Sequence, residues 1–368
     1  MSAYARMRRH FDYPLFLLTV ILVVTGLLLI SSASIVVSEK NFDTPYYYVT
    51  RQAVYALAGL GVLLVFQAVP YRFWRVVALP ALLASLALTA AVFIPKLGFA
   101  TKGATRWLDI GPATIQPSEL LKISLILYLA SWLDRKKSDI RSFTASFIPF
   151  VVVLGTVGAL LVLQPDIGTL LVIGGAAVLV YFLGGSGILQ IIALGVLAAV
   201  ALGVVVAVEP YRANRIIAFL DPSASPQGIG YHINQALIAI GSGGFWGRGF
   251  GQSIQKHSYL PEPMGDSIFA VLVEEMGFLG GLLLILAYFA FFARSMIIAR
   301  RVPDGFGKLV VAGFGALITL QAFINMAAIS GFLPLTGIPL PFISYGGTAL
   351  VVTLGMVGIM LAVSKRAT

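Results

Sequence analysis

The 368-residue sequence contains no cysteine, and only 11% of its residues are charged. Without cysteine the chain can form no disulfide, no thiolate metal site and no cysteine nucleophile. Its three histidines, His10, His232 and His257, lie too far apart to have the ligand spacing of a zinc site. Apolar residues make up 59% of the chain, and the mean hydropathy is +0.95. A soluble globular protein is excluded, and a protein that crosses the membrane many times is predicted.

The net charge of +10 does not indicate nucleic-acid binding, because the basic residues lie between apolar runs, where membrane topology explains them. If the N-terminus is cytoplasmic, most of the 25 lysines and arginines fall on the cytoplasmic side. Both termini are therefore expected in the cytoplasm. The first apolar run is long enough to span a bilayer and carries no cleavage pattern, so no removable signal peptide is predicted.

Apolar runs of about 20 residues, the length that crosses the bilayer core, predict an all-α polytopic fold. We expect a single domain over residues 1–368 with ten membrane-spanning helices. Their predicted bounds are 12–33, 52–69, 76–94, 117–133, 143–163, 166–184, 188–208, 268–294, 307–330 and 346–364. Residues 143–184 form one nearly continuous apolar run, in which Pro165 forces the turn between two crossings.

The longest polar stretch, residues 209–267, connects predicted helices seven and eight and should face outward. Five of its apolar side chains recur at helical spacing, at Ile229, Ile233, Ala236, Leu237 and Ile240. This pattern predicts a short helix in the membrane interface, and it suits either a structured cap or a substrate-handling loop. Asp266 ends the loop at the hydrocarbon boundary. A carboxylate there is costly unless it is used or paired, so Asp266 is the first catalytic candidate.

Two further outer stretches are predicted to be irregular. Residues 331–347 are too apolar for an ordinary loop and too rich in proline and glycine for a helix. Such backbone at membrane depth survives only when it is buried in protein or lines a cavity. Residues 240–244 contain three glycines, which either form a plain turn or present amides that cradle an anion.

Charged residues near the outer ends of the predicted helices are candidates for chemistry. Glu119 and Lys122 share one face of the fourth helix, and an ion pair inside a membrane is a functional hypothesis by default. Arg106, Arg212 and Arg215 lie on the outer side. Together they could bind pyrophosphate, whereas snorkelling to lipid headgroups would explain each arginine alone.

Other polar residues have both structural and functional interpretations. Asp166 follows Pro165, where a helix cap and a catalytic role are equally compatible. Glu274 and Glu275 are adjacent in the eighth helix, so at least one must face the interior of the bundle. Gln321 and Asn325 form a polar stripe of the kind that more often joins helices than contacts substrate.

Seven blocks of the sequence resemble the SEDS family of bacterial cell-wall polymerases, whose members include FtsW, RodA and SpoVE. The resemblance covers nearly the whole chain. The matching blocks are GATRWL (103–108), QPSELLK (116–122), QPDIGT (164–169), GY through Q to AIGSGG (230–244), YLPE with Asp266 (259–266), EEMG (274–277) and PLPFISYGG (339–347). Within the family, residues 31–34 and 253–263 are more similar to the division enzyme FtsW than to the elongation enzyme RodA.

The resemblance implies a peptidoglycan glycosyltransferase of the bacterial cytoplasmic membrane, with its catalytic face outward. It would polymerise lipid II for septal wall synthesis and release undecaprenyl pyrophosphate. Asp266 matches the catalytic carboxylate of the family. The substrate-binding residues carried over from the matching blocks are Arg106, Glu119, Lys122, Arg215, Gln235 and Ser344. One departure is that Met264 and Gly265 precede the aspartate, where the family usually has His-Thr.

The resemblance also implies partners and leaves alternatives open. A class B penicillin-binding transpeptidase, other divisome proteins and membrane lipids are the expected partners, with no built-in protein metal site. A divalent cation, Mg or Mn, is allowed at the pyrophosphate. A lipid II flippase, a RodA-like elongation polymerase and a scaffold for the transpeptidase are the alternatives. The sequence shows no internal repeat of the kind that transporters have, which favours the enzyme.

Overall fold

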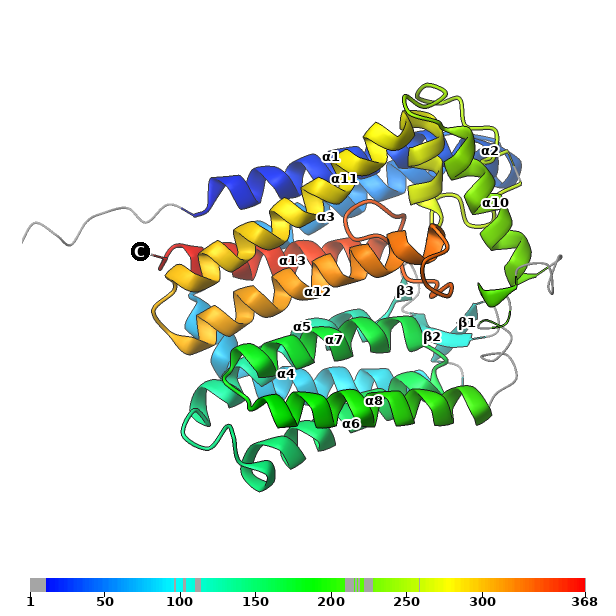
Figure 1. Cartoon of the computed structure of the whole chain (residues 1–368). Helices are drawn as coiled ribbons and strands as arrows, with labels where there is room; N and C mark the ends of the chain where they lie inside the picture. The colour runs from blue at the N-terminus through cyan, green and yellow to red at the C-terminus, as the bar shows by residue number, and fades with distance from the viewer. Residues whose placement is uncertain are drawn as a thin grey trace, which may run out of the picture.

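A computed structural model of the chain describes residues 11–367, except 96, 102–103, 110–113, 209–214, 216, 218, 222–227 and 258. Long helices run side by side and form a bundle (Figure 1). Their bounds are α1 (Tyr13–Ala33), α3 (Tyr47–Ala68), α4 (Tyr71–Ala91), α5 (Pro117–Arg135), α6 (Ile148–Leu163), α7 (Ile167–Leu183), α8 (Ile188–Val208), α11 (Ile268–Arg301), α12 (Gly305–Ile329) and α13 (Gly347–Ser364). Shorter elements are α2 (Ile35–Phe42), α10 (Ile229–Ser242) and a π-helical turn, Phe143–Phe147, that leads into α6.

Each of the ten predicted spans corresponds to a helix, which confirms the all-α polytopic class. Eight described helices, one of them α6 with its π-helical turn, are long and apolar enough to cross a membrane. The other two predicted spans are α7, which has 17 residues, and α5, which carries Glu119, Lys122, Asp134 and Arg135. The predicted bounds of α3, α4 and α11 were too short, because polar and aromatic residues at their ends also adopt helical geometry.

The helices differ in how much of their surface the bundle buries. In the most apolar windows of α12 and α13, 83% and 78% of the residues are buried, against 6% in α8. Helix α13 packs along α3, where a Cβ on Gly358 would lie 2.6 Å from the carbonyl oxygen of Leu63. Only glycine allows this approach of the two backbones. The core therefore lies at α12 and α13, and α8 lies at the edge of the bundle (Figure 1).

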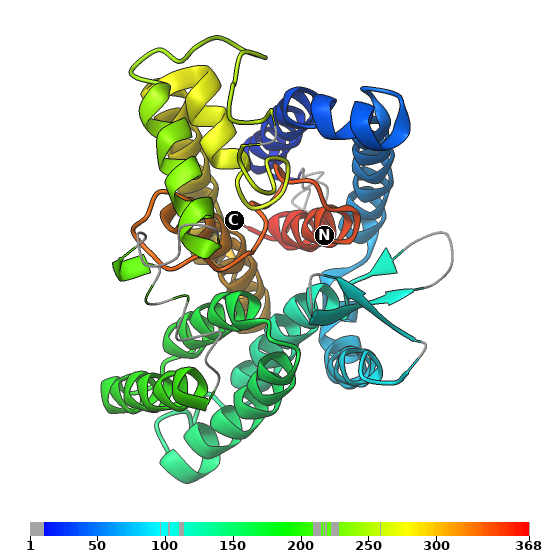
Figure 2. The same ribbon diagram turned by 90° about the vertical axis from the view of Figure 1, so that its right-hand side faces the viewer.

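The two ends of the bundle differ in character. At one end, the Asp12 carboxylate accepts a 2.6 Å bond from Arg294 of α11, and its backbone N–H donates to the Ser364 hydroxyl at 3.0 Å. The start of α1 thus lies beside the end of α13. At the other end lie α2, α10 and the irregular segments, as the view in Figure 2 shows. All the predicted site residues except the buried pair on α5 lie in or beside this second set of elements.

A three-stranded antiparallel sheet lies at this second end and was not predicted from the sequence. Strand β1 (Gly98–Thr101) pairs with β2 (Ala104–Asp109), and β2 pairs with β3 (Thr114–Ile115). The Thr348 hydroxyl at the start of α13 donates to the carbonyl of Thr114 at 3.1 Å. The strands are too short to show an apolar alternation, so only their pairing reveals them.

Helix α11 is broken at Gly277, whose φ of 70° and ψ of −170° are not helical. The loop after α10 pairs with the broken turn: the N–H groups of Arg248 and Gly249 donate to the carbonyls of Glu274 and Glu275, each at 3.0 Å. A Cβ on Gly277 would lie 2.3 Å from the backbone nitrogen of Gly247. The glycine run at 240–244 leads into this contact, and the N–H of Gly243 donates to Ile240, so the plain turn is the interpretation that the structure supports.

The substitution Gly277→Ala is expected to destabilise the protein markedly. A Cβ would impose both a positive φ and a backbone clash, and each such strain costs on the order of 1–3 kcal/mol. The midpoint of thermal unfolding in detergent should fall clearly. Gly174→Ala on α7 is the matched control, because no atom lies within 4 Å of the added Cβ, and it should leave the midpoint unchanged or slightly higher. Equal effects of the two substitutions would contradict the close approach of Gly277 to the backbone of Gly247.

Candidate functional site

Asp266 lies in a tight turn immediately before α11. The N–H groups of Gly265 and Ser267 donate to the carbonyl of Glu262 at 2.9 and 3.3 Å, and Glu262 itself has a φ of 51°. The Ser267 hydroxyl donates to the carbonyl of Pro261 at 2.7 Å. These bonds fix the backbone of the turn from within. Asp266 as a whole is half-buried, and its Oδ1 atom is buried, so only part of the side chain is open to a substrate while the backbone stays in place.

The irregular segment 331–347 packs directly against this turn. The Ser344 hydroxyl donates to the carbonyl of Gly265 at 2.7 Å, and the N–H of Tyr345 donates to the carbonyl of Met264 at 2.8 Å. Both contacts use backbone carbonyls of the turn. They therefore do not depend on the side chains of Met264 and Gly265.

Helix α12 joins the same segment to Asp266. The Asn325 amide donates to the carbonyls of Asp266 and Ile338, each at 2.8 Å, and the Gln321 amide donates to the carbonyl of Pro339 at 2.9 Å. The predicted polar stripe thus joins elements, as expected. Gln321 and Asn325 also support the Asp266 turn and the segment 331–347. The sequence does not predict this role, because it does not show which backbone carbonyls face α12.

Glu119 and Lys122 form the predicted ion pair one turn into α5. The Lys122 ammonium donates to Glu119 Oε1 at 2.7 Å and to the side-chain oxygen of Gln321 at 2.8 Å. The two charged side chains are 3% and 2% exposed. Among the described residues, Glu119 Oε2 has no hydrogen-bond partner, so one buried acceptor stays available. Gln321 links this pair to Pro339 and hence to the segment that contacts the Asp266 turn.

The predicted arginines bind backbone carbonyls at the outer end. Arg106, on β2, donates to the carbonyls of Gln164 and Pro165 and lies 3.9 Å from the Asp166 carboxylate. Arg215 donates to the carbonyl of Leu335 at 3.2 Å. The segment that Arg106 binds, at the start of α7, lies against the segment that Arg215 binds: a Cβ on Gly168 of α7 would lie 2.8 Å from the carbonyl oxygen of Thr336. Both guanidinium groups are therefore anchored to neighbouring parts of the fold.

Asp166 accepts a hydrogen bond from the N–H of Thr169 at 3.4 Å, so it caps α7, which was one of its two interpretations. Arg212 lies outside the described residues.

Helix α10 places His232 and Gln235 on adjacent turns near the same region. His232 Nε2 lies 2.6 Å from the hydroxyl of Ser267, the residue after Asp266. Gln235, the predicted substrate-binding residue, is half-buried, and its side chain makes no hydrogen bond within the described part of the chain. The sequence analysis excludes His232 from a zinc site and predicts no other role for it. Its spacing of three from Gln235 on one helix was the available signal.

The two adjacent glutamates of α11 are both buried, beyond the prediction that at least one faces inward. Glu274 accepts hydrogen bonds from the Ser253 hydroxyl at 2.5 Å and from the N–H of Ile254 at 3.0 Å. Glu275 pairs with Lys256 at 2.9 Å and accepts from the hydroxyl of Ser32 on α1 at 2.6 Å. These carboxylates hold the loop that ends in Asp266 and so support the site from one side.

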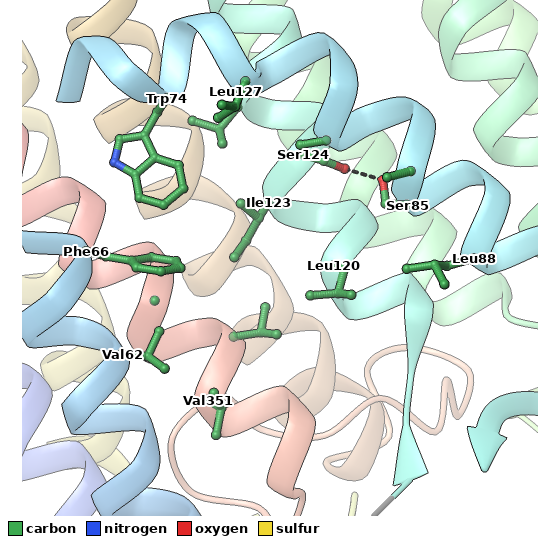
Figure 3. Close-up of a pocket in the computed structure, with 15 residues that line it drawn as sticks. Val62, Phe66, Trp74, Ser85, Leu88, Leu120, Ile123, Ser124, Leu127 and Val351 are labelled. Carbon is green, nitrogen blue, oxygen red and sulfur yellow. Dashed lines mark hydrogen bonds between the residues drawn. The ribbon is translucent and has the colours of Figure 1, made fainter. Parts of the chain in front are cut away.

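A separate apolar cavity of about 390 Å³ lies between α3, α4, α5 and α13 (Figure 3). Phe66 and Trp74 line one end, and Leu88 and Leu120 line the other. The Ser85 and Ser124 hydroxyls in its lining bond to each other at 2.5 Å. The cavity has no ionisable residue in its lining, so it can hold an apolar chain but cannot carry out the chemistry.

The carboxylates of the site are dispersed rather than clustered. Within the described residues, no group of three or more His, Asp or Glu side chains could hold a metal ion. Magnesium, however, usually binds through one or two carboxylates together with substrate phosphates. Asp266 is a suitable ligand of that kind, so the donor set fits a cation that arrives with a phosphorylated substrate.

Comparisons with known proteins cover almost the whole chain. Residues 13–368 match the FtsW/RodA/SpoVE family, described as cell cycle proteins. The chain is 40% identical over 357 residues to a probable peptidoglycan glycosyltransferase FtsW of Geobacter sulfurreducens, a match that covers 97% of this chain and 96% of that protein. It is 37% identical to the stage V sporulation protein E of Bacillus subtilis, covering 96% and 97% of the two chains.

Solved structures with the same fold support these matches. One is a chain of a peptidoglycan synthase complex, from a structure that describes the structural coordination of polymerization and crosslinking. That chain has a TM-score of 0.80 and 30% identity to this one, and the match covers 96% of this chain and 97% of that chain. The rod shape determining protein RodA of Thermus thermophilus has a TM-score of 0.72 and 28% identity, with coverages of 97% and 98%.

Proposed function

Because the chain belongs to the FtsW/RodA/SpoVE family of cell cycle proteins, we infer that it is a peptidoglycan glycosyltransferase that polymerises lipid II into glycan strands. Its similarity to FtsW proteins favours septal wall synthesis during division. A RodA-like role in elongation is the alternative within the family.

One observation carries the mechanistic proposal. Asp266 is a half-buried residue in a turn whose backbone is bonded to Ser344 and Asn325, and Gln321 connects the buried Lys122 to the segment that holds this turn. A general base needs this combination of fixed position and access, and the departure of an anionic group needs nearby cations.

In the proposed reaction, the 4-hydroxyl of the acceptor sugar attacks the anomeric carbon of the donor. Asp266 takes the hydroxyl proton as the new carbon–oxygen bond forms. The bond between the anomeric carbon and the pyrophosphate oxygen breaks, and undecaprenyl pyrophosphate leaves with the electron pair. Lys122, Arg106 and Arg215 supply the positive potential for the departing group. Gln235 contacts the bound lipids, while the buried Glu119 and Ser344 support the binding site by holding Lys122 and the Asp266 turn. Arginine suits this role because its forked donors match phosphate oxygens.

A divalent cation, Mg or Mn, is proposed to enter with the pyrophosphate. When bound, it would neutralise developing charge on the phosphate oxygens. Asp266 would hold it through one carboxylate oxygen, which leaves the other oxygen to take the proton. The undecaprenyl chain itself requires apolar surface, which the cavity between α3, α4, α5 and α13 offers.

We also propose an orientation and a partner. The excess of basic residues at the end where α1 begins and α13 ends supports cytoplasmic termini, with the Asp266 turn on the outer side. The similarity to a chain from a complex that coordinates polymerization and crosslinking supports a class B penicillin-binding transpeptidase as partner. Other divisome proteins would associate with that pair.

Incubation of the purified protein with lipid II tests the function. We expect glycan polymers on a gel, formed in detergent as well as in liposomes, and formed less well after chelation of divalent cations if a cation assists. Reconstitution that moves lipid II across the liposome membrane without making polymer would instead identify a flippase. A protein that does neither but still binds the transpeptidase would be a scaffold.

A further inference from the structure

The corner between α2 and α3, at the same end of the bundle as Asp266, is built from aromatic rings. Phe42 stacks on Tyr47 with ring centroids 3.5 Å apart and an interplanar angle of 10°. Tyr48 meets Tyr47 edge to face at 5.3 Å. Next to them the Tyr46 side chain is 65% exposed, and Phe42 is 42% exposed. We call Phe42, Tyr46, Tyr47, Tyr48, Arg51 and Tyr345 the aromatic corner.

The aromatic corner is continuous with the Asp266 turn. The Tyr48 ring lies edge to face with Tyr345 at 5.1 Å, and the N–H of Tyr345 is the donor to Met264. Gln52 fastens the same stretch, because its amide donates to the carbonyl of Ser344 at 3.3 Å and its oxygen accepts from the N–H of Gly346 at 3.2 Å. A row of rings therefore leads from the surface to within two residues of Asp266.

Arg51 adds a positive charge to this row. Its guanidinium lies 5.5 Å from the centre of the Tyr47 ring and donates to the Tyr47 hydroxyl at 2.8 Å, yet the residue is exposed. Arginine has five N–H donors in a fork that matches a carboxylate.

These contacts combine two chemistries that recognise acidic sugars. The face of an aromatic ring is electron-rich, so it attracts the C–H groups that lie on one face of a pyranose. A forked guanidinium binds a carboxylate with two parallel hydrogen bonds. A peptidoglycan strand presents both partners, since its backbone is a chain of pyranose sugars and every second sugar carries a lactyl-peptide branch that ends in a carboxylate.

We propose that the aromatic corner is a subsite for the growing glycan strand, in which exposed rings stack on pyranoses and Arg51 pairs with a peptide carboxylate. The inference rests on the proposed glycosyltransferase function and specifies where its polymer is held. A strand held at this corner stays beside the Asp266 turn between additions, so the subsite favours long products over release after each step.

A membrane-interface role is the competing explanation, because tyrosine is enriched where lipid meets water. That role requires an amphipathic or apolar side chain but no sugar-binding geometry. Leucine at position 46 would keep most of the apolar surface and remove the ring, whereas phenylalanine would keep the ring. Trp246, which is 75% exposed in the loop between α10 and α11, provides a control ring outside the aromatic corner.

The test measures binding of lipid-free glycan oligosaccharides with intact stem peptides to the protein in nanodiscs. Arg51→Gln and Tyr46→Leu should each weaken binding about tenfold, the size expected for loss of one partly desolvated cation or ring contact. Tyr46→Phe should stay close to wild type, and so should Trp246→Leu. With lipid II as substrate, Arg51→Gln and Tyr46→Leu should also give shorter polymers.

Equal binding by all four variants would overturn the subsite and leave the aromatic corner as an interface anchor. Because Tyr46 is exposed, its variants keep the test informative even if Arg51→Gln folds poorly. The polymerisation assay separates the two proposals. If the wild type makes polymer, and the variants match it in oligosaccharide binding and in polymer length, the subsite alone is refuted. A wild-type protein that makes no polymer refutes the function, whatever the oligosaccharides do.

Discussion

Replacing Asp266 with asparagine is expected to lower polymerisation of lipid II by about 10²–10⁴-fold, the usual contribution of a general base. The amide is isosteric but cannot take the proton of the attacking sugar hydroxyl. The bond from Asn325 goes to the backbone carbonyl of Asp266, and the bonds from Ser344 and Tyr345 go to neighbouring carbonyls. The substitution touches none of them, so the fold should persist. Single-turnover conversion of labelled lipid II measures the loss.

Glu39→Gln is the matched control for this experiment. Glu39 is an exposed carboxylate of α2 at the same end of the bundle, and its loss removes one negative charge without reaching the Asp266 turn. Its activity should equal that of the wild type. If Asp266→Asn polymerises lipid II at the wild-type rate, another group must take the proton, and the catalytic assignment fails.

Replacing Lys122 with methionine is expected to have the second-largest effect, on both stability and activity. The side chain is 3% exposed and bonds to Glu119 and Gln321. Its loss leaves the buried Glu119 charge without its cation, which typically destabilises a protein by about 3–5 kcal/mol. Thermal unfolding in detergent should show a large decrease in the midpoint. Polymerisation should fall by about 10²–10³-fold, the loss seen when a donor to a developing charge is removed.

A double variant separates the two effects. Glu119→Gln combined with Lys122→Met removes both charges and leaves neutral groups of similar size, so most of the lost stability should return. Activity should not return, because the positive potential for the departing pyrophosphate is still missing. A double variant that is stable and fully active would show that Lys122 serves the fold alone.

The architecture could be predicted from hydropathy because each span is an apolar run of nearly the right length. The short outer elements could not. Strands β1 to β3 owe their form to pairing with one another and to the bond from Thr348 of α13 to Thr114. Helix α2 is held against the start of α3, where the N–H of Tyr48 donates to the Ser38 hydroxyl. The helix at α10 was predicted because its apolar residues repeat at helical spacing, a local signal.

The site could be predicted as a set of residues but not as an arrangement. Lys122 had to have a partner, and Glu119 at a spacing of three was the nearest one. Gln321 was the missing part of that contact, since a second helix, α12, supplies it from 199 positions further along the chain. Similarly, Arg106 was placed in a pyrophosphate site by its charge, whereas its observed bonds go to the carbonyls of Gln164 and Pro165. Every residue has a backbone carbonyl, so a sequence cannot show which of them accepts a hydrogen bond from an arginine.

The packing of α13 along α3 has a consequence for biosynthesis. Gln52 of α3 is buried and completes its hydrogen bonds only with Ser344 and Gly346, which leave the ribosome nearly 300 residues later. At translation rates of about 5–20 residues per second, that interval lasts tens of seconds. During it, an amide inside the bilayer has to find a temporary partner. An unfinished chain consequently lacks Ser344 and Tyr345, which hold the Asp266 turn, and we expect it to be inactive until its last helix is inserted.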